Sequence, residues 1–143
     1  MKISDCMSRD VRLVSPQDSI QSAARCMAEI DAGILPVSND DRLIGIVTDR
    51  DIAIRGTGNG LAPQAQVQDV MSNDVSYCYD DEDTADLLET MSHIQVRRLP
   101  VLNRDKRLVG IVSITDLAAQ EAANTGEALD AIARPSPRHS QTL

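Results

Sequence analysis

A hydroxyl side chain followed three residues later by an aspartate occurs twice in this chain, each time directly after a short apolar run. The two copies are Gly45-Ile46-Val47-Thr48-Asp49-Arg50-Asp51 and Gly110-Ile111-Val112-Ser113-Ile114-Thr115-Asp116. This spacing is a helix-start signature, because the hydroxyl and the acid can each accept a free backbone N–H. A strand that runs into such a helix start also brings N–H groups and a carboxylate together, which suits a phosphate and a diol. The motif therefore predicts either a helix cap alone or part of a nucleotide site.

The residues around the motif recur as well. Asp5-Cys6-Met7-Ser8 matches Asp69-Val70-Met71-Ser72, and Leu35-Pro36-Val37 matches Leu99-Pro100-Val101, each 64 positions later. One extra residue in the polar turn at 103–106 then shifts the second motif to 65 positions after the first. An insertion confined to a turn is typical of two copies of one fold.

Each repeat predicts the element order β-α-β-β-α. The apolar helix positions share one face in both copies, because they are spaced at i, i+1, i+4 and i+7. They are Ala23, Ala24, Met27 and Ile30 in the first repeat and Leu87, Leu88, Met91 and Ile94 in the second. The predicted elements are an extended piece at 11–14 or 75–78, a helix from about 18 or 82, a strand at 34–37 or 98–102, the strand of the motif, and a helix from Asp51 or Asp116. We expect the core to contain Val37, Ile46, Val47, Val101, Ile111 and Val112.

The repeats divide the chain of 143 residues into four parts. We predict a first repeat at 1–55, a linker at 56–68, a second repeat at 69–120, and a C-terminal helix with a flexible tail at 121–143. Glycine and proline mark 56–63 as loop. After Leu117 the chain is rich in alanine and is expected to be helical to about Ala133, before Pro135 and Pro137 stop the helix.

The composition excludes several classes of protein. Apolar residues make up 42% of the chain, enough for a packed core, but there are only two Tyr and no Phe or Trp. Aromatic stacking platforms for single-stranded nucleic acid are therefore missing. The net charge of −8 disfavours nucleic acid and anionic membranes. No apolar run is long enough to span a membrane. The three cysteines have no metal-ligand or redox spacing, so we expect reduced thiols in a cytoplasmic protein.

These motifs, in this order and present twice, resemble a tandem pair of CBS domains, the Bateman module. The resemblance covers about residues 3–120. It implies an α+β fold in which two β-α-β-β-α repeats pack sheet to sheet about a pseudo-twofold axis. It further implies a regulatory module that is not an enzyme, forms a homodimer, and binds AMP, ADP or ATP, with S-adenosylmethionine or NAD as other candidates. Most members of the family are fused to enzymes, channels or transporters, but this one is expected to stand alone.

The resemblance also implies which residues form two ligand clefts. The motif aspartate would hold the ribose hydroxyls, the hydroxyl residue and nearby basic side chains the phosphate, and the backbone before the L-P-V strand the adenine. The cleft around Asp116 would use Asp116, Ser113, Thr115, Arg97 and Arg98, with Asp10, Arg12, Ala32 and Gly33 from the other repeat. The cleft around Asp51 would use Asp51, Thr48 and Arg50, with Val96 and Ser76.

The two clefts are expected to differ in charge. The second repeat has Arg97-Arg98 where the first has Gly33-Ile34. A charge-assisted hydrogen bond contributes about 1.5–3 kcal/mol, so we expect the Asp116 cleft to be the better phosphate site. Neighbouring strand residues face opposite ways, so only one of the two arginines is expected to point into the cleft. The alternative is that both form a solvated edge that pairs with nearby acids.

No catalytic constellation is visible in the sequence. His93 has no second ligand at metal-binding spacing, and the acidic run at 80–83 reads as a solvated helix start. We therefore expect no metal site and no enzyme. The leading hypothesis is an adenine-nucleotide sensor that modulates a partner protein. Its alternative is a ligand-free structural or dimerisation module whose hydroxyl-x-x-Asp motifs are only caps. A small hydrolase or transferase is a distant third.

Overall fold

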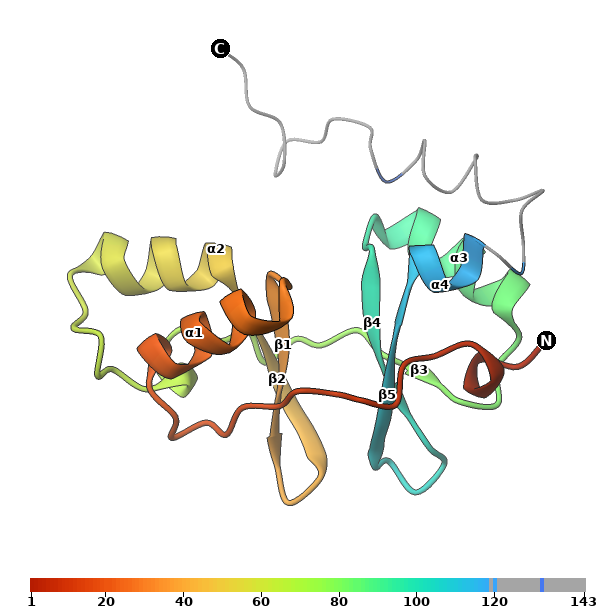
Figure 1. Cartoon of the computed structure of the whole chain (residues 1–143), viewed down its shortest axis with the longest axis horizontal. Helices are drawn as coiled ribbons and strands as arrows, with labels where there is room; N and C mark the ends of the chain where they lie inside the picture. Colours follow the sequence, from red (N-terminus) through yellow and green to blue (C-terminus); the bar gives the residue numbers. More distant parts are fainter. Residues whose placement is uncertain (119, 121–131, 133–143) are drawn as a thin grey trace, which may run out of the picture. The chain divides into compact units, whose positions relative to one another are not determined.

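The computed structural model describes residues 1–118, 120 and 132, and they fall into two compact units (Figure 1). The repeat-1 unit consists of Asp10–Ser76 and Asp105–Leu108. The repeat-2 unit consists of Met1–Arg9, Tyr77–Arg104 and Val109–Leu143. Each unit combines a small sheet with helices, which is the predicted α+β class.

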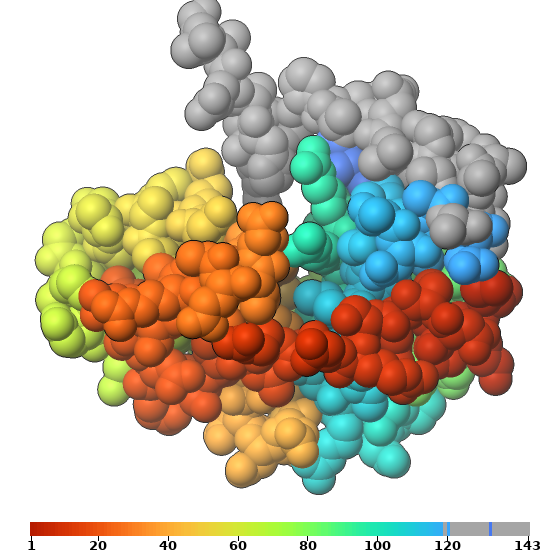
Figure 2. Space-filling view, viewed as in Figure 1, coloured from red at the N-terminus to blue at the C-terminus, as the bar shows by residue number. Residues whose placement is uncertain are grey.

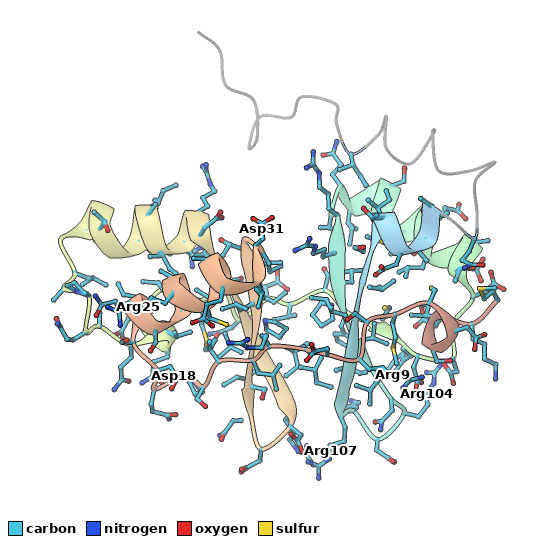
Figure 3. All side chains as sticks on the ribbon, in the orientation of Figure 1. Arg9, Asp18, Arg25, Asp31, Arg104 and Arg107 are labelled. Atoms are coloured by element: carbon cyan, nitrogen blue, oxygen red, sulfur yellow. The ribbon has the colours of Figure 1, made fainter. Side chains whose placement is uncertain are left out.

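The repeat-1 unit is built on an antiparallel hairpin. Strand β1 (Ile34–Asn39) pairs with β2 (Arg42–Thr48) in a register that places Leu35 opposite Val47. Helix α1 (Ile20–Ile30) begins where Ser19 Oγ accepts the N–H of Ser22 at 3.0 Å. It ends at Asp31, which has the left-handed φ of 53° and is labelled in Figure 3 at the end of α1. After β2 come α2 (Asp49–Asp51), a π-helical turn (Ile52–Gly56) and two 3₁₀ turns (Thr57–Asn59 and Val67–Asp69).

The repeat-2 unit has a three-stranded sheet in the order β3-β4-β5. Strand β3 (Cys78–Tyr79) is parallel to β4 (Arg98–Leu102), and β5 (Leu108–Ser113) follows the turn after β4. Helix α3 (Thr84–Ile94) is capped by Asp83, and α4 (Ile114–Ala118) follows β5 directly. A 3₁₀ turn (Ile3–Asp5) also belongs to this unit. The described part of this repeat therefore has the predicted order β-α-β-β-α.

The core of each unit includes residues that lie outside its α-helices and strands and far from them in the sequence. Ile3 and Met7 are buried in the repeat-2 core. On the surface drawn in Figure 2, the red N-terminal atoms lie next to the blue atoms of the same unit. Ser8 and Ile111 exchange two backbone hydrogen bonds of 2.9 Å. In the repeat-1 unit, Val67 is fully buried, although it lies in the predicted linker. Val67 thus completes the core of the repeat-1 unit, and residues 1–9 complete the core of the repeat-2 unit, although they stand at the start of the predicted first repeat.

Residues 105–108 likewise belong to the repeat-1 unit, although they come from the second repeat of the sequence. The Arg107 guanidinium donates to the Asp40 carbonyl at 2.8 Å, and the Leu108 N–H donates to Asp41 at 3.1 Å. Asp40 and Asp41 form the hairpin turn between β1 and β2, beside which Figure 3 labels Arg107. Both aspartates have positive φ values, 53° and 64°.

The core prediction is right for four of the six residues. Val37, Val47, Val101 and Val112 have no exposed surface. Ile46 and Ile111 were predicted in the core wrongly, since both are only half-buried. They alternate with Val47 and Val112 along the strands and so face the other side of the sheet. The predicted apolar helix faces are also partly wrong. Ala24 is exposed, and Ile30 and Ile94, in the last turns of α1 and α3, are 36% and 37% exposed.

Several predicted boundaries also shift. The piece at 11–14 is not a strand, and only Val14 forms a bridge, to Val37. The piece at 75–78 becomes strand only at Cys78–Tyr79. Helices α2 and α4 begin two residues before Asp51 and Asp116, directly after the capping hydroxyl. Thr57–Asn59 is a 3₁₀ turn within the predicted loop. The predicted helix to Ala133 and the tail lie outside the described residues, except for Ala118, which ends α4, and for Gln120 and Ile132.

Candidate functional site

Both hydroxyl-x-x-Asp motifs form complete helix caps. In the repeat-2 unit, Ser113 Oγ accepts the N–H of Asp116 at 3.1 Å, and Asp116 Oδ2 accepts the N–H of Ser113 at 2.9 Å. In the repeat-1 unit, Thr48 and Asp51 make the same pair of bonds, both at 3.0 Å. The local sequence explains this geometry, because Ser or Thr before the first turn and an acid three residues later satisfy two free N–H groups reciprocally.

The caps leave hydrogen-bonding capacity unused. Each cap uses only one carboxylate oxygen, Oδ2, and an ionised carboxylate has about four acceptor positions. Within the described ranges, no hydrogen bond reaches Oδ1 of Asp116 or Asp51. The two carboxylates are half-buried and so are reachable from solvent. A cap and a hydroxyl-binding carboxylate are therefore compatible in one residue.

The residue just before a strand lies next to each motif, and this residue is of a different type in the two units. The N–H of Ile114 donates to the carbonyl of Arg97 at 2.9 Å, and the N–H of Asp49 donates to the carbonyl of Gly33 at 2.9 Å. Val96 and Ala32 precede these two acceptors and follow left-handed helix ends. Val96, Arg97, Arg98, Ser113, Thr115 and Asp116 are thus brought together in the repeat-2 unit, and Ala32, Gly33, Thr48, Arg50 and Asp51 in the repeat-1 unit.

The arginines of the repeat-2 unit are available to an anion. Arg97 and Arg98 are both exposed; Arg97 directly precedes β4, and Arg98 is its first residue. Neither forms an ion pair or a side-chain hydrogen bond with another residue in the part of the chain that the structure describes. The alternative expectation, an edge that pairs with nearby acids, therefore has no contact to support it among these residues.

The repeat-1 unit has a carboxylate at the matching place, which the sequence reading missed. Asp49 Oδ1 accepts the N–H of Arg50 at 2.8 Å. A Cβ added to Gly33 would lie 2.8 Å from Asp49 Oδ2, so a side chain at position 33 would displace this carboxylate. The signal was present in the motif, because Asp49 aligns with the apolar Ile114.

The remaining predicted residues are not brought to either motif by a described contact within their unit. Asp10 and Ser76 are exposed and make no side-chain hydrogen bond to a described residue. Arg12 donates to Glu29 Oε2 at 2.9 Å, so a phosphate would compete with this exposed pair for its guanidinium. Each predicted cleft combines residues of both units, and its assembly stays a prediction.

Cys6 lies in the electrostatic surroundings of Asp116. Burial raises the pKa of its thiol, and the carboxylates of Asp116 and Asp5 raise it further. The acidic run at 80–83 is engaged locally. Asp83 caps α3, and Asp81 forms a two-pronged pair with Arg104, whose hydrogen bonds lower the pKa of Asp81. No group of three or more metal-ligating side chains is found among the described residues, and no helix among them is long and apolar enough to cross a membrane.

Comparison with protein families gives a match over most of the chain. The model of the CBS domain matches residues 3–55 and 67–122. The CBS domain-containing protein YhcV of Bacillus subtilis is 38% identical over 122 residues, which are 85% of this chain and 86% of YhcV. Hypoxic response protein 1 of Mycobacterium tuberculosis is 40% identical over 116 residues, 80% of each chain. The matched region therefore makes up most of both relatives.

Solved structures share the fold. A structure of Hypoxic Response Protein I with two coordinated zinc ions has a TM-score of 0.75 and 37% identity, and it covers 83% of this chain and 98% of that one. The CBS domain pair of MJ0100, in complex with 5′-methylthioadenosine and S-adenosyl-L-methionine, has a TM-score of 0.72 and 25% identity over 84% of this chain and 98% of that one. CBSX2 in complex with AMP has a TM-score of 0.75 over 85% and 96% of the two chains, and its 23% identity shows the fold alone.

Proposed function

The chain belongs to the CBS domain family, and on that premise we propose that it is a regulatory module that binds an adenine nucleotide and thereby alters its interaction with a partner protein. One observation carries the proposal. In the repeat-2 unit, a capped aspartate with an uncommitted oxygen lies next to two exposed arginines without ion pairs among the described residues. The carboxylate suits the ribose hydroxyls and the arginines suit phosphate. The adenosine ligands of MJ0100, a relative of the same fold, support an adenosine compound.

The proposal assigns the phosphate to the repeat-2 motif. Asp116, Ser113 and Thr115, with Arg97 and Arg98, would hold the ribose and phosphate, and the backbone at Val96 or Ala32 would contact the adenine. On a protein of net charge −8, a phosphate should choose the place where positive charge is local. Distant acids matter less, because the Debye length at physiological salt is about 8 Å.

Ligand-induced stabilisation tests the proposal against its alternative. A ligand at one hundred times its dissociation constant should add about 2.7 kcal/mol to the free energy of unfolding. We expect at least one of AMP, ADP, ATP, NAD and S-adenosylmethionine to raise the melting temperature by several degrees. If none of them does so at millimolar concentration, the motifs are only caps and the module is structural. That alternative has support, since both caps are fully formed.

Calorimetry on variants locates the site. Asp116→Ala should remove most nucleotide binding, Asp51→Ala should remove less, and Arg98→Ala should weaken ATP and ADP more than adenosine. Arg104→Ala is the matched control, because Arg104 is an exposed arginine of the same unit that pairs with Asp81. Wild-type ATP affinity in Arg98→Ala, with loss of binding in Asp51→Ala, would refute the assignment.

We also propose that the chain forms a homodimer in the cytoplasm and acts on a regulated protein partner. Among the described residues, the apolar side chains of Ile30 and Ile94, in the last turns of α1 and α3, and of Ile54 are exposed. Sedimentation at micromolar concentration should therefore give about twice the mass of the chain. A species of 15.5 kDa alone would contradict the dimer.

A further inference from the structure

Asp49 holds a negative charge beside the repeat-1 motif. Its backbone N–H donates to Gly33 at 2.9 Å, and its Oδ1 accepts the N–H of Arg50 at 2.8 Å. Two hydrogen bonds thus fix both its backbone and its carboxylate. In the repeat-2 unit the matching residue is Ile114, which is only 6% exposed and is part of the core. The two motifs therefore differ in charge at their first helical position.

Gly33 and Asp49 form a matched pair. The Asp49 carboxylate lies where a side chain at position 33 would begin, since an added Cβ would meet Oδ2 at 2.8 Å and Cγ at 3.2 Å. In the repeat-2 unit the same two positions are Arg97 and Ile114, joined by the equivalent backbone hydrogen bond of 2.9 Å. Next to the position just before the first strand of the hairpin, the repeat-1 unit thus has the carboxylate of Asp49, whereas the repeat-2 unit has an arginine at the matching position.

We infer that Asp49 makes the repeat-1 motif reject phosphate groups, so that this motif takes an adenosine compound without phosphate while the repeat-2 motif takes the nucleotide. The inference rests on the proposed function and deepens it. Around the repeat-1 motif, the two negative charges of Asp49 and Asp51 exceed the single positive charge of Arg50. Around the repeat-2 motif, Arg97 and Arg98 outnumber Asp116. The ribose-binding carboxylate is common to both, so the discrimination concerns only what is attached to the 5′ position.

The expected discrimination follows from Coulomb's law. Two like charges 4 Å apart in water repel by about 1 kcal/mol, which is a factor of about five in affinity. A phosphate monoester carries a charge of about −1.5 to −2 near pH 7. We therefore expect the repeat-1 motif to prefer adenosine over AMP by about tenfold to thirtyfold at low salt, and less at high salt.

The experiment uses Asp116→Ala as background, which removes the ribose ligand of the repeat-2 motif. Adenosine and AMP are titrated calorimetrically into this variant and into the double variant that also carries Asp49→Asn. Asparagine has nearly the same shape and keeps an oxygen that can accept the Arg50 N–H, so the negative charge is removed without loss of this acceptor. Asp40→Asn in the same background is the matched control. It removes one negative charge at the hairpin turn, about 20 Å along β1 from Gly33 and beyond the Debye length.

We expect Asp49→Asn to raise the affinity for AMP by about fivefold or more and to leave adenosine almost unchanged, with no such change in Asp40→Asn. Equal binding of adenosine and AMP in the background variant overturns the inference, as does an equal response to both charge removals. If wild type binds a nucleotide but the background variant binds neither ligand, the inference fails and the proposed function stands. If wild type binds no adenine compound at all, both fail.

Discussion

The N-terminal segment of the repeat-2 unit is held over β5 so closely that only glycine fits at position 110. A Cβ on Gly110 would lie 2.6 Å from Met7 Sδ and 2.8 Å from the carbonyl oxygen of Ser8. The methionine can change rotamer, but Ser8 is fixed by its two backbone hydrogen bonds to Ile111. Gly110→Ala must therefore push the segment away from β5 or distort the strand.

The cost can be worked from these contacts. Opening the Ser8–Ile111 pair loses two hydrogen bonds of about 1 kcal/mol each. Overpacking without opening costs about 1–3 kcal/mol. We expect Gly110→Ala to lower the free energy of unfolding of the repeat-2 unit by about 2 kcal/mol, or roughly 1 M in the urea midpoint. Hydrogen exchange of the amides of Ser8 and Ile111 should accelerate more than exchange in β1 and β2.

A matched control separates this packing effect from a general sensitivity of the segment. Ser8→Ala keeps the backbone hydrogen bonds, and the Ser8 side chain is exposed, so stability should change by less than about 0.5 kcal/mol. The packing of residues 1–9 against β5 is refuted if Gly110→Ala is as stable as wild type and if hydrogen exchange of the Ser8 and Ile111 amides is unchanged.

Two further predictions concern the cap and the buried thiol. Ser113→Ala should cost about 1 kcal/mol in urea unfolding, because the N–H of Asp116 loses its acceptor, and Ser113→Thr should restore most of the loss. Burial raises the pKa of Cys78 from 9.0 to about 12, so the folded protein keeps a proton that the unfolded chain releases above pH ~9. The free energy of unfolding should therefore fall between pH ~9 and ~12, by up to about 1.4 kcal/mol per pH unit more than that of Cys78→Ala. If the two proteins show the same pH dependence, the thiol is not buried in its neutral form.

Much of the fold could be predicted because the same signals occur twice. Ser19 and Asp83 mark the starts of α1 and α3, and the valines of the two motifs are buried as the strand pattern requires. Local chemistry decides these features. What the sequence could not give is the partner of each segment. Ile3 and Met7 lie at the start of the predicted first repeat, yet they are buried with the second, because a short apolar segment carries no information about which core it completes.

The failures in the core have the same origin. Ile46 and Ile111 are as apolar as their neighbours, so composition alone places them inside. Their exposure depends on which sheet face is covered, and this is a tertiary property. At the site, the capping hydroxyls and acids were predicted from their spacing. Asp49 was missed because an acid in a first helical turn is expected from the helix dipole alone, so its mismatch with Ile114 in the second repeat did not indicate its position beside Gly33.

The caps explain which variants can report on ligand binding. Asp116 uses one oxygen for the cap and keeps the other, so folding of α4 already fixes the orientation that a ribose would need. The ordering entropy of this side chain is then lost on folding and not on binding. For the same reason, loss of binding in Asp116→Ala has two explanations, a missing ligand group and a loosened helix start. Arg98 caps nothing, and Asp49→Asn keeps an acceptor for the Arg50 N–H, so changes at these two positions affect charge without removing a cap. The difference between the units in their response to phosphate is therefore best measured at Arg98 and Asp49.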